Sequence, residues 1–361
     1  MRIRRRLPVI VVVLLVITAV ALAVVLRKHA PPEPARLLPS ADGFVYVNFS
    51  WIRRAILTSE IAPVPHDPDY EQFIQATGFQ FERDLEQAAL AVHYASTGGL
   101  PENRFSEVLV GKVDGERLRA YLQKLASSTE SYEGRSIYDI QLEGRTLRVC
   151  MLGVDTVAAS NHPDPQIIRG IIDRSRKLAS PFGGPLLLRQ YYKHVPLASV
   201  AWGIFEANSN SSSKNSSNPN SSNPDSPSNS SGAGSSLLDW NFLFSQPAVV
   251  VASVRYLASV HLRTEAFTAS EAEATHVASQ LTTFLDVFRA AEVSVGAPAP
   301  DADMAAFFSS LKVEQKGDRA ELTATVPPGL LRKVVAEAPQ ATTTPTPAPP
   351  PPPPAKSRKH H

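Results

Sequence analysis

The chain has 361 residues, 43% hydrophobic and 19% charged, so it can form one large domain or two modest ones with a sizeable core. Its formal net charge is +2, but nine basic residues lie beside one apolar run or at the C-terminus, which leaves the rest of the chain acidic. An acidic body disfavours binding to a phosphate backbone, so we expect no nucleic-acid partner. The single cysteine, Cys150, excludes an intrachain disulfide, and its apolar neighbours predict a core residue.

The strongest signal is the apolar run from Leu7 to Leu26, interrupted only by Pro8 and Thr18. A helix of about 20 residues spans the roughly 30 Å hydrocarbon thickness of a bilayer. Basic residues are denser before the run than after it. This bias predicts a cytoplasmic stub at 1–6, a transmembrane helix at 7–26 in contact with the lipid bilayer, and an ectodomain outside the cytoplasm. We therefore expect a single-pass protein of the bacterial cytoplasmic (inner) membrane.

A cleaved signal peptide is the alternative interpretation of this run. Ala19, Ala21 and Ala23 resemble the small residues of a cleavage site. They lie inside the apolar run, however, and the run is longer than the about 7–15 residues of a signal-peptide core. An uncleaved signal anchor is therefore the favoured prediction.

Beyond the membrane, the proline-rich residues 27–39 predict a stiff spacer. A first α+β lobe is expected at 40–205. It opens with the β-rich run 44–49, and apolar residues at helical spacing predict a helix over 118–125. Asp164-Pro165 predicts the start of another helix. Further β-rich runs predict strands at 88–94, 108–113, 135–140, 145–152, 155–160 and 197–205.

Ser and Asn dominate residues 206–238. Such a segment cannot bury enough surface to offset the entropy lost on ordering, so it predicts a disordered linker. Its composition fits two arrangements equally: a connection between two lobes, or a long loop leaving one sheet.

A second α+β lobe is expected at 239–337. Two strands are predicted over 249–256 and 259–267, and a hairpin over 312–326. Between them, Ser270 with Glu273 three residues later forms a capping-box pattern at the start of a helix.

Residues 338–361 predict a disordered, proline-rich, basic tail. We expect this tail to be a solvated spacer. Two alternatives are contact of its three basic residues with anionic head groups or an envelope polymer, and docking of its prolines in an aromatic groove.

Short turns between neighbouring strands and irregularly placed helices favour an α+β fold over a doubly wound parallel sheet. The full prediction is two lobes with mainly antiparallel sheets packed against helices, preceded by one transmembrane helix.

Several short motifs carry a resemblance to a group of known proteins: Leu38-Pro39, Thr77-Gly78-Phe79, Gly111-Lys112-Val113-Asp114, Tyr132-Glu133-Gly134 and Val313-Glu314-Gln315-Lys316-Gly317. Over residues 38–205 and 245–337 the chain resembles uncharacterised bacterial envelope proteins with an N-terminal signal anchor and a two-lobed α+β ectodomain. The resemblance implies a periplasmic ectodomain of unknown function, and it assigns no catalytic residue.

Two proline-shaped loops offer a candidate metal site. His66 and Asp67 lie on one loop, and His162 and Asp164 on the other. Two histidines with a carboxylate suit zinc or iron, and convergence of the four side chains within about 5 Å in a concave pocket would favour an enzyme. Asp beside Pro more often shapes turns and caps helices. We therefore predict no catalytic, cofactor-binding or metal-binding residues and no cofactor.

The sequence has no Gly-x-Ser-x-Gly elbow, the motif of many serine hydrolases, and no phosphate-binding loop of the kind that binds nucleotides. His93 alternates with apolar residues and predicts a sheet-face position. We expect a non-enzymatic binding or scaffold ectodomain whose partner is an envelope protein or polymer. One alternative is a membrane-anchored hydrolase or metalloenzyme that uses the His/Asp loops, and another is an adaptor that acts through the proline tail.

Overall fold

The computed structural model describes residues 30–56, 66–97, 100–142, 144–176, 183–207, 243–257, 259–294, 302–330 and 333. The predicted transmembrane helix at 7–26 and the predicted tail at 338–361 lie outside the described residues, as does most of the predicted linker at 206–238. Among the helices that are described, none is both long enough and apolar enough to cross a bilayer.

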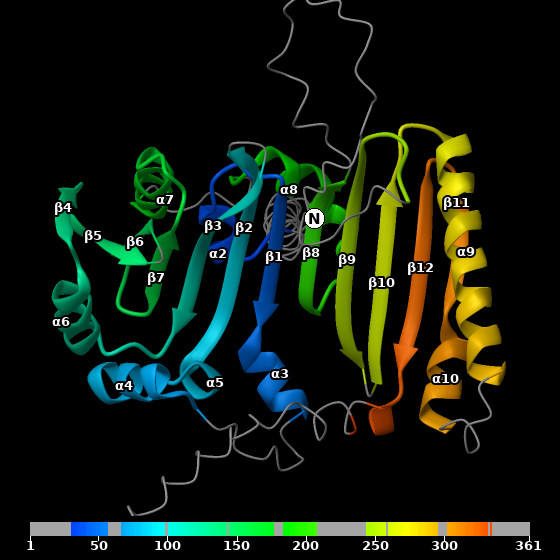
Figure 1. The fold of residues 1–361 in the computed structure, drawn as a ribbon, viewed down its shortest axis with the longest axis horizontal. Coiled ribbons are helices and arrows are strands. Elements are labelled where there is room, and N and C mark those ends of the chain that lie inside the picture. The colour runs from blue at the N-terminus through cyan, green and yellow to red at the C-terminus, as the bar shows by residue number, and fades with distance from the viewer. Residues whose placement is uncertain are drawn as a thin grey trace, which may run out of the picture.

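Twelve strands form a single sheet in the order β11-β12-β10-β9-β8-β1-β2-β3-β7-β6-β5-β4 (Figure 1). Every neighbouring pair is antiparallel. The strands are β1 (Gly43–Asn48), β2 (Leu85–Thr97), β3 (Leu100–Gly111), β4 (Ser128–Tyr132), β5 (Arg135–Leu142), β6 (Arg145–Met151), β7 (Thr156–Ser160), β8 (Ser199–Ala207), β9 (Ala248–Leu257), β10 (Ser259–Phe267), β11 (Lys312–Lys316) and β12 (Arg319–Val326).

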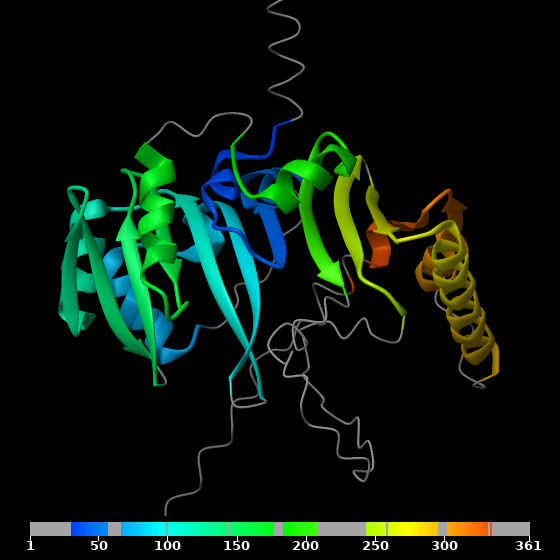
Figure 2. The ribbon, with the colours of Figure 1, turned by 90° about the horizontal axis from the view of Figure 1, so that it is seen from above.

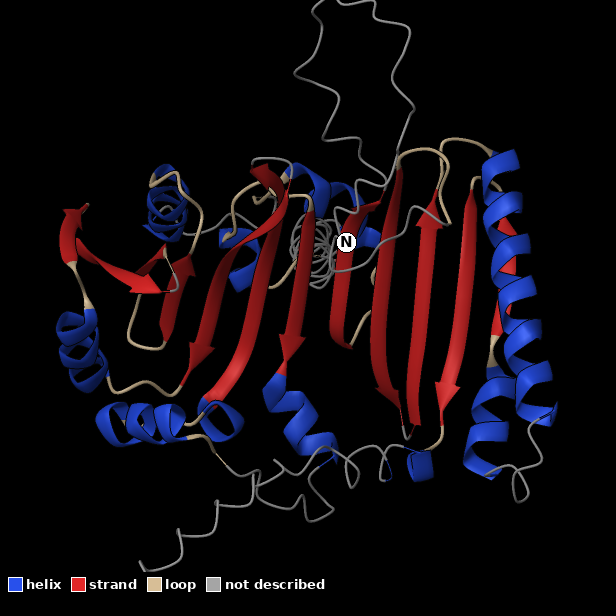
Figure 3. Cartoon of the chain, in the orientation of Figure 1, coloured by secondary structure: helices blue, strands red, loops and turns tan. Residues whose placement is uncertain are grey.

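The helices lie on both faces of this sheet (Figures 2 and 3). They are α2 (Glu33–Leu37), α3 (Phe49–Ile56), α4 (Pro68–Thr77), α5 (Phe81–Asp84), α6 (Gly115–Leu125), α7 (Gln166–Arg176), α8 (Leu186–Tyr191), α9 (Glu271–Ser294) and α10 (Ala302–Ser310), with a 3₁₀ turn η1 (Tyr192–His194) after α8. Figure 2 shows α2, α7 and α8 on one face, and α9 on the other.

The α+β class and the antiparallel pairing are confirmed, but the strands do not divide into separate sheets for two lobes. β8, from the first predicted lobe, pairs along its length with β9, from the second. β8 also pairs with β1, so the sheet continues through the middle of the chain without a break. The Ser/Asn-rich segment therefore connects two neighbouring strands of one sheet.

The core is divided between the two faces. The largest cluster packs α2, α7 and α8 against the middle of the sheet, with Phe44, Trp202 and Ile204 among its buried members. On the opposite face, α6 packs on β5–β7 through Leu118 and Leu122, while α9 packs near β9, β10 and β12 through Val277.

The predicted spacer at 27–39 is wrong for residues 31–39, because these residues are part of the fold. Pro32 is the N-cap of α2 and Pro34 is its second residue, positions where a missing N–H is tolerated. Ala35 and Leu38 are 0% and 1% exposed within the main core cluster. Arg174 Nε also donates to the Leu37 carbonyl oxygen at 2.7 Å. Proline here starts a core helix rather than extending a linker.

The predicted cap of α9 is confirmed for its backbone half. The Glu273 N–H donates to Ser270 Oγ at 3.2 Å. The Glu273 carboxylate does not turn back to Ser270. It accepts from the Ser245 N–H at 3.0 Å and from the Ser245 hydroxyl at 2.8 Å, and these bonds hold the pKa of Glu273 below its usual value. The start of α9 is thereby fixed to the turn before β9.

Replacing Leu38 with Ala tests whether this segment belongs to the core. We expect Leu38→Ala to lower the free energy of unfolding by about 2–5 kcal/mol, because it opens a cavity between α2 and the sheet. Glu33→Ala, at an exposed position of the same helix, is the control and should change it by less than about 0.5 kcal/mol. Denaturant unfolding followed by tryptophan fluorescence measures both free energies. Equally small effects of Leu38→Ala and Glu33→Ala would show that the segment is a spacer and not part of the core.

Candidate functional site

In the first predicted loop, His66 and Asp67 both bond to residues of the neighbouring helices. His66 Nδ1 lies 2.8 Å from Glu71 Oε1, and its Nε2 lies 2.5 Å from Glu82 Oε1. The hydrogen bond to Glu71 is the largest cause of a raised His66 pKa. Asp67 Oδ1 accepts from the Tyr70 N–H at 2.8 Å, which makes Asp67 the N-cap of α4. The capping interpretation of Asp67 is therefore confirmed.

The second predicted loop is also used locally. Asp164 Oδ1 accepts from the Gln166 N–H at 2.8 Å at the start of α7. His162 Nδ1 accepts from the Asp164 N–H at 3.1 Å, and its ring centroid lies 5.2 Å from that of His93. In Figure 1, α4 and α7, which follow the two loops, lie at opposite ends of the strands.

The two loops therefore form no common site. Consistent with this, the described part of the chain holds no group of three His, Cys, Asp or Glu side chains placed to bind a metal ion.

His93 lies on β2 and belongs to a small polar cluster with Ser106 and Ser160. Its Nε2 is 3.4 Å from Ser106 Oγ, which is 2.9 Å from Ser160 Oγ. Burial, followed by the neighbouring His162, lowers the pKa of His93. Both serines are buried, at 0% and 2% exposure, so neither offers an accessible nucleophile. Cys150 is likewise a core residue, and burial raises the pKa of its thiol to about 11.

The sheet itself presents a different kind of candidate site. Between α6 at one end and α9 at the other, no described helix lies in front of the upper parts of β1, β2, β8 and β9, and α3 lies at their lower ends (Figure 1). We call this surface the open face. Directly paired residues of antiparallel strands share a face, so the registers define its members. The half-buried apolar ones are Val45, Leu90, Phe205 and Ala252 in the upper and middle parts, and Val47, Ala88, Leu109, Ala201, Val254 and Leu262 on the same face toward the lower ends, where α3 begins.

Two glycines shape the centre of the open face. A Cβ atom added to Gly43 or to Gly203 would come within 2.5 Å of the Phe205 ring. Gly43 pairs with Phe205, and Gly203 lies two residues before it on β8. The ring therefore lies over the backbone of these glycines, and larger residues there would displace it.

Glu107 lies within this apolar surface, paired with Leu90 on one side and Ala159 on the other. In the described residues its carboxylate has no hydrogen bond or ion pair. Burial raises its pKa above the usual value. A carboxylate in such surroundings destabilises the fold when it ionises.

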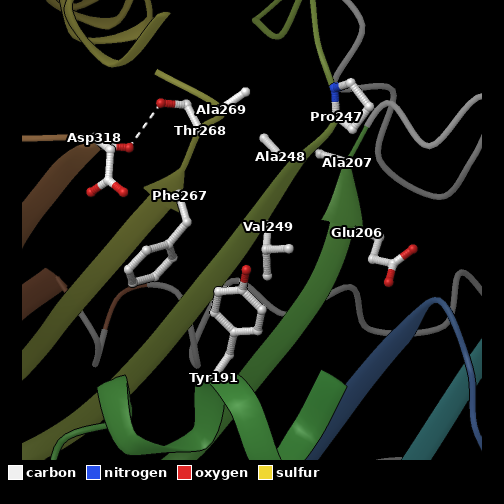
Figure 4. A pocket seen from close by; sticks show the side chains of 10 residues that line it. All are labelled: Tyr191, Glu206, Ala207, Pro247, Ala248, Val249, Phe267, Thr268, Ala269 and Asp318. Atoms are coloured by element: carbon white, nitrogen blue, oxygen red, sulfur yellow. Dashed lines mark hydrogen bonds between the residues drawn. The ribbon is translucent and has the colours of Figure 1, made fainter. Parts of the chain in front are cut away.

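A separate hollow of about 460 Å³ lies at the end of β8–β10 (Figure 4). Val249, Phe267 and Tyr191 provide apolar walls, while Glu206, Thr268 and Asp318 add polar groups. The Thr268 hydroxyl donates to the Asp318 carbonyl oxygen at 2.8 Å. Burial, then the charges of Glu206 and Asp318, raises the pKa of Tyr191.

Comparison with known proteins identifies no family. No family model matches the sequence, and no curated protein matches it. The structure is similar to solved structures of TP0453. Crystal form I shares 10% identity at a TM-score of 0.41, covering 85% of this chain and 98% of that one. Crystal form III shares 10% identity at a TM-score of 0.39, covering 85% and 99%. Similarity this low indicates no function for the chain.

One sequence pattern indicates the open face, although it is not needed to predict the strands themselves. The runs Phe44-Val45-Tyr46-Val47 and Val249-Val250-Val251-Ala252 are apolar at every position. Antiparallel strands with one solvated face usually alternate apolar and polar residues. Strands that are apolar on both faces indicate either a second covering layer or a binding surface.

Replacing Glu107 with Gln tests the electrostatics of this surface. A raised pKa means that the folded state holds its proton more tightly, so Glu107 costs stability as pH rises from the unfolded value through the folded one. We expect Glu107→Gln to raise the melting temperature at pH 7 and to leave it unchanged near pH 4. Thermal unfolding across this range measures the effect. A variant less stable than the wild type at pH 7 would show that the carboxylate has a stabilising partner.

Proposed function

We propose that the protein is a single-pass, membrane-anchored envelope protein whose folded part lies outside the cytoplasm and binds another envelope component without catalysis. The observation that supports binding most directly is the apolar open face, because a contiguous apolar surface of this kind is characteristic of interaction sites. The basic-flanked apolar run at 7–26 supports the anchor. The resemblance to uncharacterised envelope proteins supports the compartment.

The open face favours a partner that presents its own apolar surface. The strands β1, β2, β8 and β9 each have a hydrogen-bonded neighbour on both sides, so a partner could not add a strand to them. Side-chain packing would provide the contact instead. Val45, Leu90 and Phe205 lie near its centre, where water exclusion is most effective. An apolar segment of an envelope protein, or the apolar part of an envelope polymer, matches this chemistry.

An enzymatic function has less support. The alternative built on His66, Asp67, His162 and Asp164 requires these side chains to meet, and each is instead held by partners beside its own loop.

The membrane topology is tested with the full chain in a bacterial host. We expect it to remain in the membrane pellet after alkaline carbonate extraction, because the apolar run is long enough to span the bilayer. A protease added to spheroplasts should digest the folded part, while a cytosolic control protein stays intact. Recovery of the chain in the soluble fraction, or protection from the protease in intact spheroplasts, would contradict the proposal.

The binding surface is tested by photo-cross-linking in native envelopes. A cross-linking residue at Leu90 or Val254 should capture a discrete partner, whereas one at the exposed Val154, outside the open face, should not. Leu90→Asp should reduce capture through Val254 at least about fivefold, since burying an unpaired polar group costs about 1–3 kcal/mol.

Two controls complete this experiment. Leu90→Ala, measured alongside by thermal unfolding, separates lost binding from lost folding. Deletion of residues 338–361 should leave capture unchanged. Equal capture at Val154 and Leu90 would refute the open face as a binding site, and loss of capture on tail deletion would favour the adaptor function of the tail.

A further inference from the structure

The buried start of α2 places the folded part close to the proposed anchor. Only residues 27–30 separate Leu26, the end of the apolar run, from Pro31, which is buried in the fold. The five steps from Leu26 to Pro31 span at most about 17 Å even when fully extended. The polar layer of a bilayer is itself roughly 5–8 Å thick on each side. A fold attached through so short a connection must lie against the membrane surface or just above it.

The face of the sheet that carries α2 is therefore the face nearest to the lipid. Figure 2 shows α7 and α8 on this same face. The segment before α8 contacts α2 directly, because a Cβ atom added to Gly184 would lie 3.4 Å from the Arg36 Cα. Leu188 on α8 and Leu37 on α2 also belong to the same core cluster. α8 thus packs into the same core cluster as α2, the element to which the anchor connects, and the segment before α8 lies beside α2.

The surface of α8 and the turn after it has the composition of a membrane-interfacial segment. Leu186 is 65% exposed and Leu197 is 53% exposed. Arg189 and Lys193 between them are also exposed. No acidic residue occurs from Leu186 to Leu197. Exposed aliphatic side chains beside cations are the pattern by which a surface helix contacts acyl chains and anionic head groups together.

We propose that the segment Leu186–Leu197 lies on the anionic head groups of the membrane that holds the chain. Leu186 and Leu197 would enter the boundary with the acyl chains, and Arg189 and Lys193 would pair with lipid phosphates. This proposal rests on the membrane anchor of the proposed function and adds a second lipid contact that fixes the orientation of the fold. The sheet then has its α8 side toward the lipid and its open face away from it.

Single-cysteine labelling of the full chain tests the proposal. Cys150 is buried, with a thiol pKa of about 11, so introduced cysteines are labelled selectively. Leu186→Cys and Leu197→Cys report on the proposed contact. Val287→Cys, on α9 at the opposite face, is the matched control, since Val287 is similarly exposed at 61%. Each variant is labelled with an environment-sensitive fluorophore and reconstituted in vesicles of phosphatidylcholine mixed with phosphatidylglycerol, or of phosphatidylcholine alone.

We expect a blue-shifted emission and quenching by spin-labelled lipid at positions 186 and 197, stronger in the anionic vesicles, and neither effect at 287. Arg189→Gln and Lys193→Gln should each weaken the surface-bound population about fivefold, because a basic residue near an anionic surface contributes about 1 kcal/mol. Raising the salt concentration should have the same direction of effect.

Equal lipid quenching at 186 and 287, or equal solvent exposure of both, would overturn the proposal. Protection of 186 that depends on protein concentration but not on lipid would also overturn it, and would identify an interface between two copies of the chain. Alkaline carbonate extraction of the same samples keeps the two hypotheses apart, since a chain that resists extraction but shows no quenching at 186 retains its anchor and lacks the second contact.

Discussion

The pairing of β8 with β1 on one side and β9 on the other determines the rest of the structure. This strand joins the N-terminal and C-terminal parts of the chain into one sheet. Side chains alternate between faces along a strand, so its register also decides which residues each face receives. Trp202 and Ile204 point to the core beneath α2, α7 and α8. Gly203 and Phe205 point to the open face. A shift of the β8 register by one residue would turn Trp202 and Ile204 to the open face and Gly203 and Phe205 to the core.

The sequence predicted local elements well because their signals are local. The hairpin over 312–326, the Ser270 cap of α9 and the Asp67 and Asp164 caps depend on residues within a few positions of one another. The pairing of β8 with β9 crosses the long Ser/Asn-rich segment, and no local pattern encodes it. The spacer prediction failed for a related reason. Prolines mark both extended linkers and helix starts, and only the burial of Ala35 and Leu38 by distant strands distinguishes the two.

The candidate site shows the same limit. The histidine and aspartate loops stood out in the sequence because their residue types are chemically distinctive. Their polar groups are nevertheless bonded to partners within or beside each loop. The open face stood out less, since Val, Leu and Ala are ordinary core residues. Its character arises because the described helices cover the two ends of one sheet face and none of them covers the upper middle. Such a gap is a property of the assembled sheet, not of any segment.

Lipid contact and partner binding are proposed for opposite faces of the sheet. The reason is the place where the chain enters the fold. α2 lies on the face covered by α7 and α8, so a short connection to the proposed membrane anchor would turn this face toward the lipid. In this proposed orientation the opposite face would be directed away from the bilayer, where an apolar surface would contact partners rather than acyl chains. If the anchor instead entered on the open face, the same apolar residues would be satisfied by lipid and would need no partner. In the proposed arrangement, the surface left for recognition therefore depends on the burial of six residues at the start of the fold: Pro31, Pro34, Ala35, Leu37, Leu38 and Pro39.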